Sequence, residues 1–275
     1  MPLLSLHDRS ALAARFRRDP ALHLFELGDL DDLLWPHTSW YTLTEDGPAA
    51  LLYGVGDIPT LLAFARTDRA AELEDLLHAL LPMLPRRFFG HLSCGAEKIL
   101  DPFYSADHHA VLLRMALTDP GRTDAHPDGE WAPAPLQYSD LPELTALFAE
   151  SYPGNWFDER MLATGQYVGA RHDGRLIAVA GVHVHSPAQR VAAIGNVTTH
   201  PALRGRGAAA ACVAALCRQL ARTVDLIGLN VRADNTTAVE LYRRLGFTVV
   251  AEFGESPLSA FWRYADAPPP GCGAS

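Results

Sequence analysis

Apolar and polar positions along this chain follow two periods, and the order in which these periods alternate occurs twice. Over residues 136–265 the spacing is helical, then strand-like, then helical again, which predicts a mixed sheet flanked by helices, an α/β (α+β) fold. The strands are expected at 166–171, 176–185, 191–199, 225–231, 248–253 and 258–264, and the helices at 141–150, 205–221 and 236–245. Asp140 is expected to cap the first helix, and Asp173-Gly174 to form a hairpin turn.

Residues 1–117 repeat this order, and we interpret them as a second domain of the same kind in tandem with the first. The alternative is an unrelated α+β domain. Helices are expected at 8–18, 21–34 and 69–81 and near Ala96, and strands at 39–44, 49–55, 60–65, 87–92 and 110–117. Residues 118–135, dense in Pro, Gly and Asp, are expected to be a linker, and residues 266–275 a flexible tail.

Composition excludes several classes of function. Asp and Glu number 32 against 23 Lys and Arg, for a net charge of −9, so nucleic acid would not be attracted by overall charge. None of the four cysteines forms a C-x-x-C pair, so neither a metal site nor a disulfide framework is expected. The chain contains no apolar run of membrane-spanning length and does not start with a signal-peptide pattern. We therefore expect a cytoplasmic protein without membrane contact.

The first chemical motif is Arg204-Gly205-Arg206-Gly207-Ala208-Ala209, which follows the strand expected at 191–199 and opens an alanine-rich helix. The first N–H groups of a helix have no partner within the helix, and its dipole makes that end positive. The two glycines let the backbone approach an anion closely, and the two arginines add positive charge. The spacing matches neither a dinucleotide fingerprint nor a P-loop. The motif predicts a pyrophosphate cradle, with an ordinary tight turn as the alternative.

The second motif contains Asn235, Ala238, Leu241-Tyr242 and Gly246-Phe247. The two motifs together resemble the GNAT superfamily of acyl-CoA-dependent N-acyltransferases, with its signatures R/Q-x-x-G-x-G/A and N-x-x-A-x-x-L-Y-x-x-x-G-F. The resemblance covers roughly residues 134–265, with both motifs in the expected order. This half is also similar to the glycine N-acyltransferase-like branch, which points to an amino acid or another small amine as the acceptor.

The resemblance implies acetyl-CoA as the acyl donor and assigns the roles of particular residues. The pyrophosphate is expected on residues 204–209, and the pantetheine arm along the backbone of Val197, Thr198 and Thr199, near Asn235 and Ala238. A backbone N–H at this strand end would polarise the thioester carbonyl. Asn235 is also a candidate helix N-cap.

Tyr242 is the expected catalytic acid. A phenol is protonated at neutral pH and can donate a proton to the departing thiolate, which is the role that the resemblance assigns to this tyrosine. The alternative is an aromatic side chain that only packs the helix onto the sheet.

The general base is not evident, because the strand expected at 191–199 contains no acidic residue. His183 and His185 on the preceding strand are the nearest candidates, and Asn196 is a candidate for positioning a water. A structural histidine, or an amine that arrives already neutral, is the alternative. The aromatic segment 152–157 is interpreted either as a lid over the acceptor or as a loop anchored by Trp156.

In the first half, the cradle position reads Arg66-Thr67-Asp68-Arg69-Ala70-Ala71-Glu72, without glycine and with acidic residues. We expect this domain to be a degenerate GNAT-like domain that does not bind coenzyme A. The whole chain is predicted to be an N-acetyltransferase that moves an acetyl group to a primary amine by direct attack in a ternary complex, as a monomer or homodimer. The alternatives are a non-catalytic acyl-CoA-binding or sensing module and a protein or peptide N-acetyltransferase.

Overall fold

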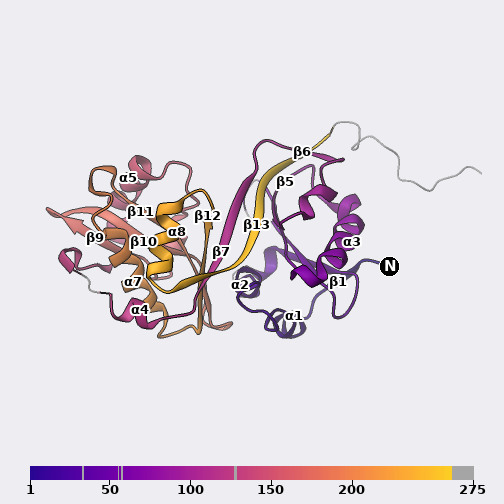
Figure 1. Ribbon diagram of the computed structural model, residues 1–275, viewed down its shortest axis with the longest axis horizontal. Coiled ribbons are helices and arrows are strands. Elements are labelled where there is room, and N and C mark those ends of the chain that lie inside the picture. Colours follow the sequence, from indigo (N-terminus) through magenta and orange to yellow (C-terminus); the bar gives the residue numbers. More distant parts are fainter. Residues whose placement is uncertain (33, 55, 57, 127–128, 262–275) are drawn as a thin grey trace, which may run out of the picture. The chain divides into compact units, whose positions relative to one another are not determined.

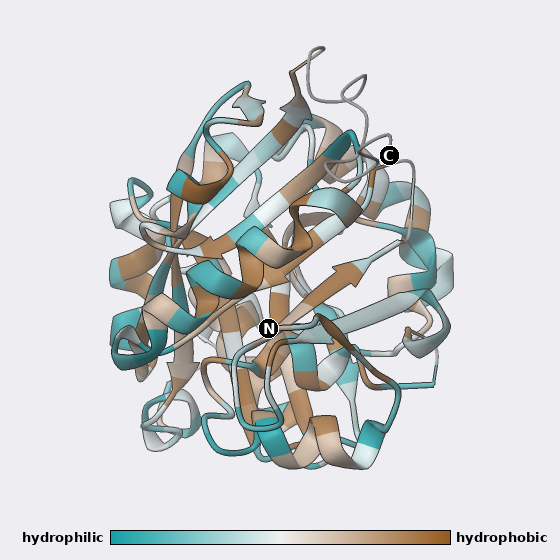
Figure 2. Cartoon of the chain, turned by 90° about the vertical axis from the view of Figure 1, so that its right-hand side faces the viewer, coloured by the Kyte–Doolittle hydropathy of each residue, from teal (hydrophilic) through white to brown (hydrophobic). Residues whose placement is uncertain are grey.

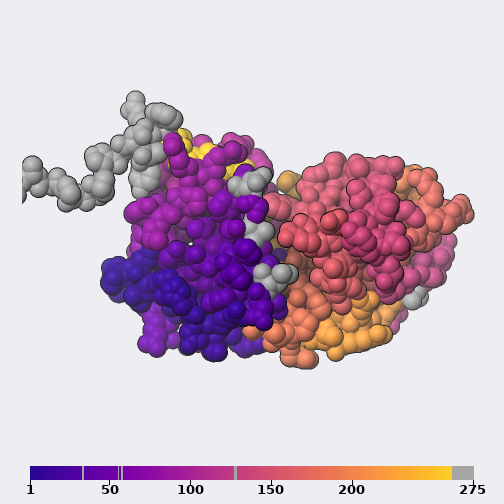
Figure 3. Space-filling view, turned by 180° about the vertical axis from the view of Figure 1, so that it is seen from behind, coloured from indigo at the N-terminus to yellow at the C-terminus, as the bar shows by residue number. Residues whose placement is uncertain are grey.

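The chain folds into two compact units that are not contiguous in sequence. The computed structural model describes residues 1–261 except 33, 55, 57, 127 and 128, so the tail expected at 266–275 and the end of the strand expected at 258–264 lie outside the described residues. Unit 1 comprises residues 1–15, 34–112 and those from 252 onward, and unit 2 comprises residues 16–33 and 113–251. This division differs from the expected one at 118–135. In Figure 3 the yellow end of the last strand lies among the violet and magenta residues of unit 1.

Unit 2 is built on a mixed sheet with the strand order β7-β12-β11-β10-β9-β8 (Figure 1). The strands are β7 (Ala110–Leu117), β8 (Ala134–Pro135), β9 (Val168–His172), β10 (Arg175–Ser186), β11 (Val191–Thr199) and β12 (Leu226–Arg232). The helices are α2 (Leu24–Gly28), α4 (Gly121–Asp124), α5 (Leu141–Ser151), α6 (Glu159–Leu162), α7 (Ala208–Leu220) and α8 (Thr236–Arg244), with 3-10 turns η5 (Gly129–Trp131), η6 (Tyr138–Asp140) and η7 (Pro201–Leu203). Strands β9, β10 and β11 are antiparallel, whereas β12 runs parallel to β11 after the crossover through α7.

Unit 1 contains the same succession of elements. Its sheet has the order β1-β2-β3-β4-β5-β13, with β6 on the far side of β13. The strands are β1 (Leu4–Leu6), β2 (Thr38–Thr42), β3 (Ala49–Tyr53), β4 (Thr60–Ala63), β5 (Arg87–Ser93), β6 (Tyr104–Ala106) and β13 (Phe247–Ala260). The helices are α1 (Arg9–Phe16) and α3 (Ala70–Leu80), with 3-10 turns η1 (Trp35–His37), η2 (Thr67–Arg69), η3 (Leu81–Met83) and η4 (Ala96–Ile99). Strands β2, β3 and β4 are antiparallel and β5 is parallel to β4, so the expected repeat of element order and the mixed sheet flanked by helices are confirmed.

Burial explains why the central strands of unit 2 read as continuous apolar runs. Residues 176–182 of β10 and 191–194 of β11 are all buried, as in a sheet covered on both faces. Helix α7 packs against β9, β10 and β11. Its buried positions are mostly alanine and cysteine, and small side chains allow a helix to lie close to a sheet. In Figure 2 apolar residues (brown) run along the strands, and hydrophilic residues (teal) are frequent in loops and on helices.

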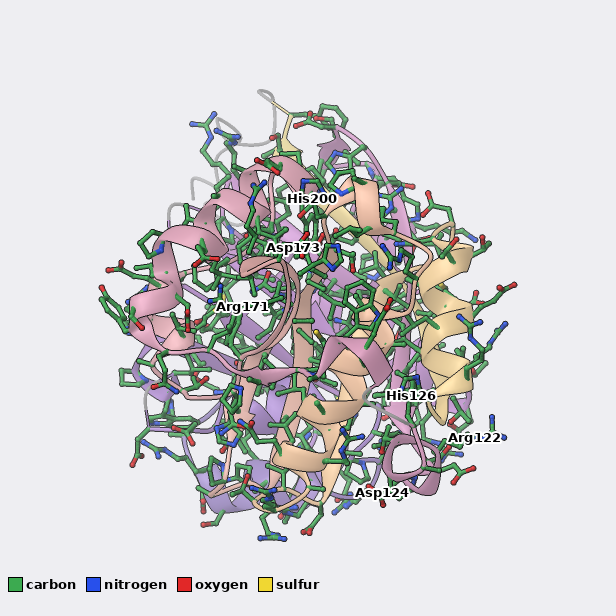
Figure 4. The ribbon with its side chains drawn as sticks, turned by 90° about the vertical axis from the view of Figure 1, so that its left-hand side faces the viewer. Arg122, Asp124, His126, Arg171, Asp173 and His200 are labelled. Carbon is green, nitrogen blue, oxygen red and sulfur yellow. The ribbon has the colours of Figure 1, made fainter. Side chains whose placement is uncertain are left out.

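Residues 118–135 are not a free linker, and that prediction is wrong. The segment contains α4, η5 and β8 and belongs to unit 2. Arg218 of α7 donates hydrogen bonds to the carbonyl oxygens of Thr123 (2.8 Å) and His126 (3.3 Å), and Thr123 is buried. Figure 4 labels Arg122, Asp124 and His126, which lie together around this short helix. Turn-forming residues predict where a chain bends, but they do not predict whether the bend packs against another element.

The helix expected at 21–34 is also shorter than its apolar pattern indicates. Among the described residues of this range, only Leu24–Gly28 is α-helical, and the backbone of Gly28 approaches β10 so closely that a Cβ there would lie 2.1 Å from the Val184 side chain. The two strands expected at 248–253 and 258–264 are a single strand, β13, through at least Ala260. Pro257 fits within it, and its carbonyl accepts a hydrogen bond from the Asp107 N–H.

Two turn predictions have different outcomes. Asp173 and Gly174 both have left-handed backbones, with φ of 48° and 78°, and they form the expected hairpin turn between β9 and β10 (Figure 4). Asp140 does not cap α5. Its carboxylate accepts the Gln137 N–H (2.7 Å) and pairs with Arg171 (2.6 Å), so it caps the preceding turn η6 instead.

Candidate active site

The turn between β11 and α7 has the geometry of an anion cradle. Gly205 and Gly207 have left-handed backbones, with φ of 76° and 89°, and open space lies where their Cβ atoms would be. Helix α7 begins at Ala208, three residues later than expected, and Gly207 provides no side-chain cap. The N–H groups of Ala208 and Ala209 therefore have no partner within the helix, and they are available to an anion.

The two arginines of the first motif do not direct their charge into this turn. Arg204 donates from Nε to the Thr199 carbonyl (3.2 Å) and from a terminal nitrogen to the Ser151 carbonyl (3.1 Å). Arg206 pairs with Glu130 at 3.1 Å. The sequence predicted that both arginine side chains would add positive charge to the cradle. The positive potential there comes instead from backbone N–H groups and the helix dipole.

Strands β11 and β12 separate immediately before the cradle. They pair only from Val191 to Ile194, opposite Leu226 to Leu229, and residues 195–199 have no paired residue on β12. The His200 N–H bonds to the Ile177 carbonyl at 2.7 Å, on the β10 side. Because successive N–H groups in a strand alternate in direction, those of Val197 and Thr199 point away from β10, towards the gap. The predicted splayed strands are therefore present, and the Thr199 carbonyl is held by Arg204.

Asn196 occupies a β-bulge at the start of this gap. Residues Val179 and Gly181 of β10 face Thr198 and Gly195 of β11, so β11 contains one extra residue between them. Asn196 has a φ of 53°, a strained conformation of the kind that persists at functional sites. The bulge changes the direction of the strand where the two strands separate.

The Asn196 side chain is almost completely buried and is held by Tyr167. Its Nδ2 donates to the Tyr167 hydroxyl at 2.9 Å, and that hydroxyl donates to the Val182 carbonyl at 3.3 Å. Asn196 Oδ1 is buried and accepts no hydrogen bond from the part of the chain that the structure describes. An acceptor left in this state favours a water or a substrate N–H as its partner.

His183 lies beside Asn196, on a second bulge in β10 between Val182 and Val184. Its ring covers Gly195 so closely that a Cβ on Gly195 would come within 2.4 Å of the imidazole. The side chain is exposed to solvent, and desolvation by the protein atoms around it lowers the pKa of His183, an effect that Asn196 partly opposes. The imidazole is therefore neutral at neutral pH, as a base must be. His185 instead contacts the Thr223 hydroxyl at 3.4 Å.

Tyr242 is buried on α8, with 7% of its surface exposed, and its ring packs edge-on against Phe247 at 5.8 Å. Burial raises the pKa of Tyr242, so the phenol stays protonated and can serve as an acid. Asn235 caps α8 as expected, because its side-chain oxygen accepts the Ala238 N–H at 3.2 Å. The cap fixes the start of the helix that carries Tyr242.

The aromatic segment 152–157 follows α5. Trp156 is 61% exposed, and the next residue, Phe157, packs against Phe148 and Tyr167 and anchors this end of the loop. Tyr152 is close enough to Tyr242 to contribute to the raised pKa of Tyr242. The loop start is fixed by the Ser151 hydroxyl, which accepts a hydrogen bond from Thr198 of β11 at 3.1 Å.

Tyr167 and Ser151 are the contributors that the sequence did not reveal. Neither belongs to a motif, and each reaches the site through a partner 29 or 47 residues away. Within the described residues, no group of His, Cys, Asp and Glu is arranged to hold a metal ion. Among the same residues, no helix has both the length and the apolar character needed to cross a membrane.

The chain is similar to known acetyltransferases. Residues 133–247 match the acetyltransferase (GNAT) family. A mycothiol acetyltransferase from Mycolicibacterium gilvum is 28% identical over 220 residues, covering 76% of this chain, and the chain spans 63% of that relative's length. A GNAT-family protein of known structure from Novosphingobium aromaticivorans is 26% identical, with a TM-score of 0.53 over 76% of this chain and 90% of that one.

A tandem GNAT protein from the clavulanic acid biosynthesis pathway has the same fold over 94% of this chain and 98% of its own, with a TM-score of 0.53 and 14% identity. That likeness agrees with the repeated order of elements in units 1 and 2. Residues 133–247, with the glycine turn and the separated strands, therefore form an acetyltransferase domain of the GNAT family.

Proposed function

We propose that unit 2 transfers the acetyl group of acetyl-CoA to a primary amine of a small molecule or amino acid by direct attack in a ternary complex. The observation that carries this proposal is the separation of β11 from β12 beside the glycine turn at 205–207. A gap edged by backbone N–H groups suits an extended amide-containing arm, and the turn at its end suits a pyrophosphate. When bound, acetyl-CoA supplies the activated thioester.

In this proposal the N–H groups of Gly205 to Ala209 bind the pyrophosphate, and the backbone of Val197 and Thr199 pairs with the pantetheine arm. The Val197 N–H also stabilises the negative charge that develops on the thioester oxygen. Thr198 contributes through its side chain instead, because its hydroxyl bonds to Ser151. Asn235 and Ala238 contribute by fixing the start of α8.

The chemical step is divided among three side chains. The acceptor nitrogen forms a bond to the carbonyl carbon, the carbon–sulfur bond breaks, and the sulfur takes the proton of the Tyr242 hydroxyl. The proton lost by the amine passes to the neutral imidazole of His183, through a water held by Asn196 Oδ1. The lowered pKa of His183 and the unpartnered Asn196 oxygen support this assignment.

Two observations favour a small acceptor. The similarity to a mycothiol acetyltransferase is a similarity to an enzyme named for a small molecule. The resemblance to the glycine N-acyltransferase-like branch points the same way, towards an amino acid or another small amine.

We further propose that unit 1 is a GNAT-like unit without a coenzyme A site. The gap that is open after β11 is closed after β4, because the Ser93 hydroxyl accepts the Ala65 N–H at 3.1 Å and donates to the Ala65 carbonyl at 3.3 Å. Where unit 2 has its glycine turn, the corresponding segment of unit 1 contains Asp68 in η2 and Glu72 in α3, and these pair with Arg66 and Arg69. These two arginines are therefore neutralised by carboxylates and offer little attraction to a pyrophosphate.

Calorimetry with coenzyme A, together with an assay of thiol release from acetyl-CoA, tests the function. The assay would use a panel of amino acids, other small amines and peptides, with the acetylated product identified by mass spectrometry. Binding with turnover of small amines is the expected result. Binding without any turnover would indicate a sensing module, turnover of peptides alone would indicate a protein acetyltransferase, and no binding would refute the proposal.

A matched pair of glycine variants locates the site. Gly207 and Gly165 both have left-handed backbones and open space at the Cβ position, so alanine strains each by about 1–2 kcal/mol. Only Gly207→Ala is expected to weaken coenzyme A binding, because only Gly207 lies in the cradle. Equal affinity in the two variants would show that the ligand binds elsewhere.

A further inference from the structure

We propose that Trp131 is a positioning residue for the pyrophosphate of acetyl-CoA, an inference that rests on the proposed function. Trp131 belongs to η5, in the segment expected to be a linker, and it is 6% exposed. Turn η5 packs against α7 and β9, the elements that flank the cradle. Its neighbour on the other side is the ring of His172, at 6.0 Å.

Trp131 and Glu130 hold Arg206 at both its main chain and its side chain. The indole Nε1 of Trp131 donates to the Arg206 carbonyl at 3.0 Å. The Arg206 guanidinium lies over the indole face at 5.2 Å and pairs with Glu130 at 3.1 Å. Arg206 is therefore fixed between two residues of η5, with its charge used outside the cradle.

The carbonyl contact fixes the direction of a cradle N–H group. The Arg206 carbonyl and the Gly207 N–H belong to one planar trans peptide, in which the two groups point in opposite directions. With the carbonyl bound to the indole, the Gly207 N–H points away from Trp131, and the open space beside Gly207 is available to an anion. A carbonyl that accepts a hydrogen bond also makes the N–H of the same peptide a stronger donor.

Loss of the indole N–H would release this peptide. The Arg206 carbonyl could then rotate towards the phosphate oxygens and repel them, while the Gly207 N–H would turn away from them. The loss of one oriented donor to an anion corresponds to about a five- to tenfold weaker affinity. The catalytic groups of the site would keep their positions, so the turnover number should change little.

The test is Trp131→Phe, which removes the indole donor and keeps a smaller aromatic ring in the core. We expect KM for acetyl-CoA and Kd for coenzyme A to rise about five- to tenfold, with kcat within about twofold of wild type. With S-acetylpantetheine, which lacks the diphosphate, kcat/KM should be unchanged. Glu130→Gln removes the charged partner of the Arg206 guanidinium and leaves the Trp131 donor in place, so it should alter Kd by less than about twofold.

The proposal is overturned if Trp131→Phe binds coenzyme A as well as wild type does, or loses as much efficiency with S-acetylpantetheine as with acetyl-CoA. A large loss in Glu130→Gln would also overturn it, since the side-chain ion pair of Arg206 would then be the determinant. If Trp131→Phe does not fold, NMR of the wild-type protein decides. The Trp131 indole N–H resonance should shift on addition of coenzyme A and not of pantetheine, and no shift with either would refute the inference. A wild-type protein that binds no coenzyme A would instead refute the proposed function.

Discussion

The side chain of Asn196 donates a hydrogen bond to the Tyr167 hydroxyl at 2.9 Å, and this bond joins two β-bulges. The Tyr167 hydroxyl bonds in turn to the Val182 carbonyl, next to the bulge that carries His183. The Tyr167 phenol therefore holds Asn196, whose neighbour Val197 presents an N–H to the gap between β11 and β12. The same phenol holds β10, the strand that carries the candidate base His183.

Tyr167→Phe is expected to loosen both bulges. The change removes one donor and one acceptor from a buried site, so the free energy of unfolding should fall by about 1–2 kcal/mol. We expect kcat to fall about tenfold, since the Val197 N–H would no longer be held in line with the thioester oxygen. Denaturant unfolding and steady-state kinetics measure the two effects. The control is Tyr138→Phe, in an exposed residue, which should leave both values unchanged; full activity in Tyr167→Phe would contradict the role.

Tyr242→Phe separates acid catalysis from packing. The ring contact with Phe247 is retained, so thermal stability and coenzyme A affinity should change little. If the hydroxyl protonates the thiolate, kcat should fall about a hundredfold or more with acetyl-CoA. The same variant should lose much less with an aryl thioester, whose thiolate leaves without protonation. A uniform loss with both donors would mean that Tyr242 only packs the helix.

The pH profile tests His183. Because desolvation lowers the pKa of His183 below its ordinary 6.5, the fraction of neutral imidazole, and with it kcat/KM, should rise with pH along a limb below 6.5 and be level above it. His183→Gln should remove this limb and reduce the rate about a hundredfold. His185→Gln is the matched control and should keep the limb. The pKa of His185 is also lowered, but its side chain contacts the Thr223 hydroxyl and not Asn196. A limb that persists in His183→Gln would assign the titration to another group.

Local patterns predicted the backbone geometry around the candidate site, because that geometry depends on local residue chemistry. Left-handed turns at Gly205, Gly207 and Asp173-Gly174 follow from residue type, and so does the Asn235 cap. The element order of both halves followed from periodicity in the same way. The identity of the domain then came from two motifs whose relative positions the fold preserves.

The contacts that the sequence did not predict are long-range. Trp131 reaches Arg206 across 75 residues, and the indole donor has no sequence pattern that indicates its acceptor. The orientation of Arg204 and Arg206 away from the cradle depends on Ser151 and Glu130, which come from other elements. The presence of arginines in the motif therefore did not predict which groups their guanidiniums contact.

Calorimetry should find one coenzyme A per chain. Unit 1 has the same succession of elements as unit 2, but Ser93 closes its strand gap and acidic residues occupy the start of α3. The variant with valine at both Gly205 and Gly207 should therefore lose all binding, whereas Ser93→Ala should leave the stoichiometry at one. Two molecules of coenzyme A bound per wild-type chain, or residual binding in the variant with both glycines replaced, would show that unit 1 also binds coenzyme A.

A buried ionic cluster in unit 2 should make stability depend on pH. Arg114 of β7 is buried with Glu26 of α2, donating to it at 3.4 Å and also to the Leu22 carbonyl. Asp29 lies nearby, and burial, reinforced by the charge of Glu26, raises the pKa of Asp29 to about 8. Its carboxyl is therefore protonated in the folded protein at neutral pH.

The sign of the effect follows from proton binding. Between pH 4 and pH 8 the unfolded chain has released the Asp29 proton and the folded chain retains it, so the free energy of unfolding should decrease as pH rises. The slope from this single group is at most about 1.4 kcal/mol per pH unit, and the stabilisation is complete below the unfolded pKa. Asp29→Asn should remove the slope while preserving the shape of the side chain. Asp173→Asn, at an exposed turn position that also suits asparagine, should leave it intact. Urea unfolding at a series of pH values measures the slope, and an unchanged slope in Asp29→Asn would show that the carboxyl is ionised in the folded state.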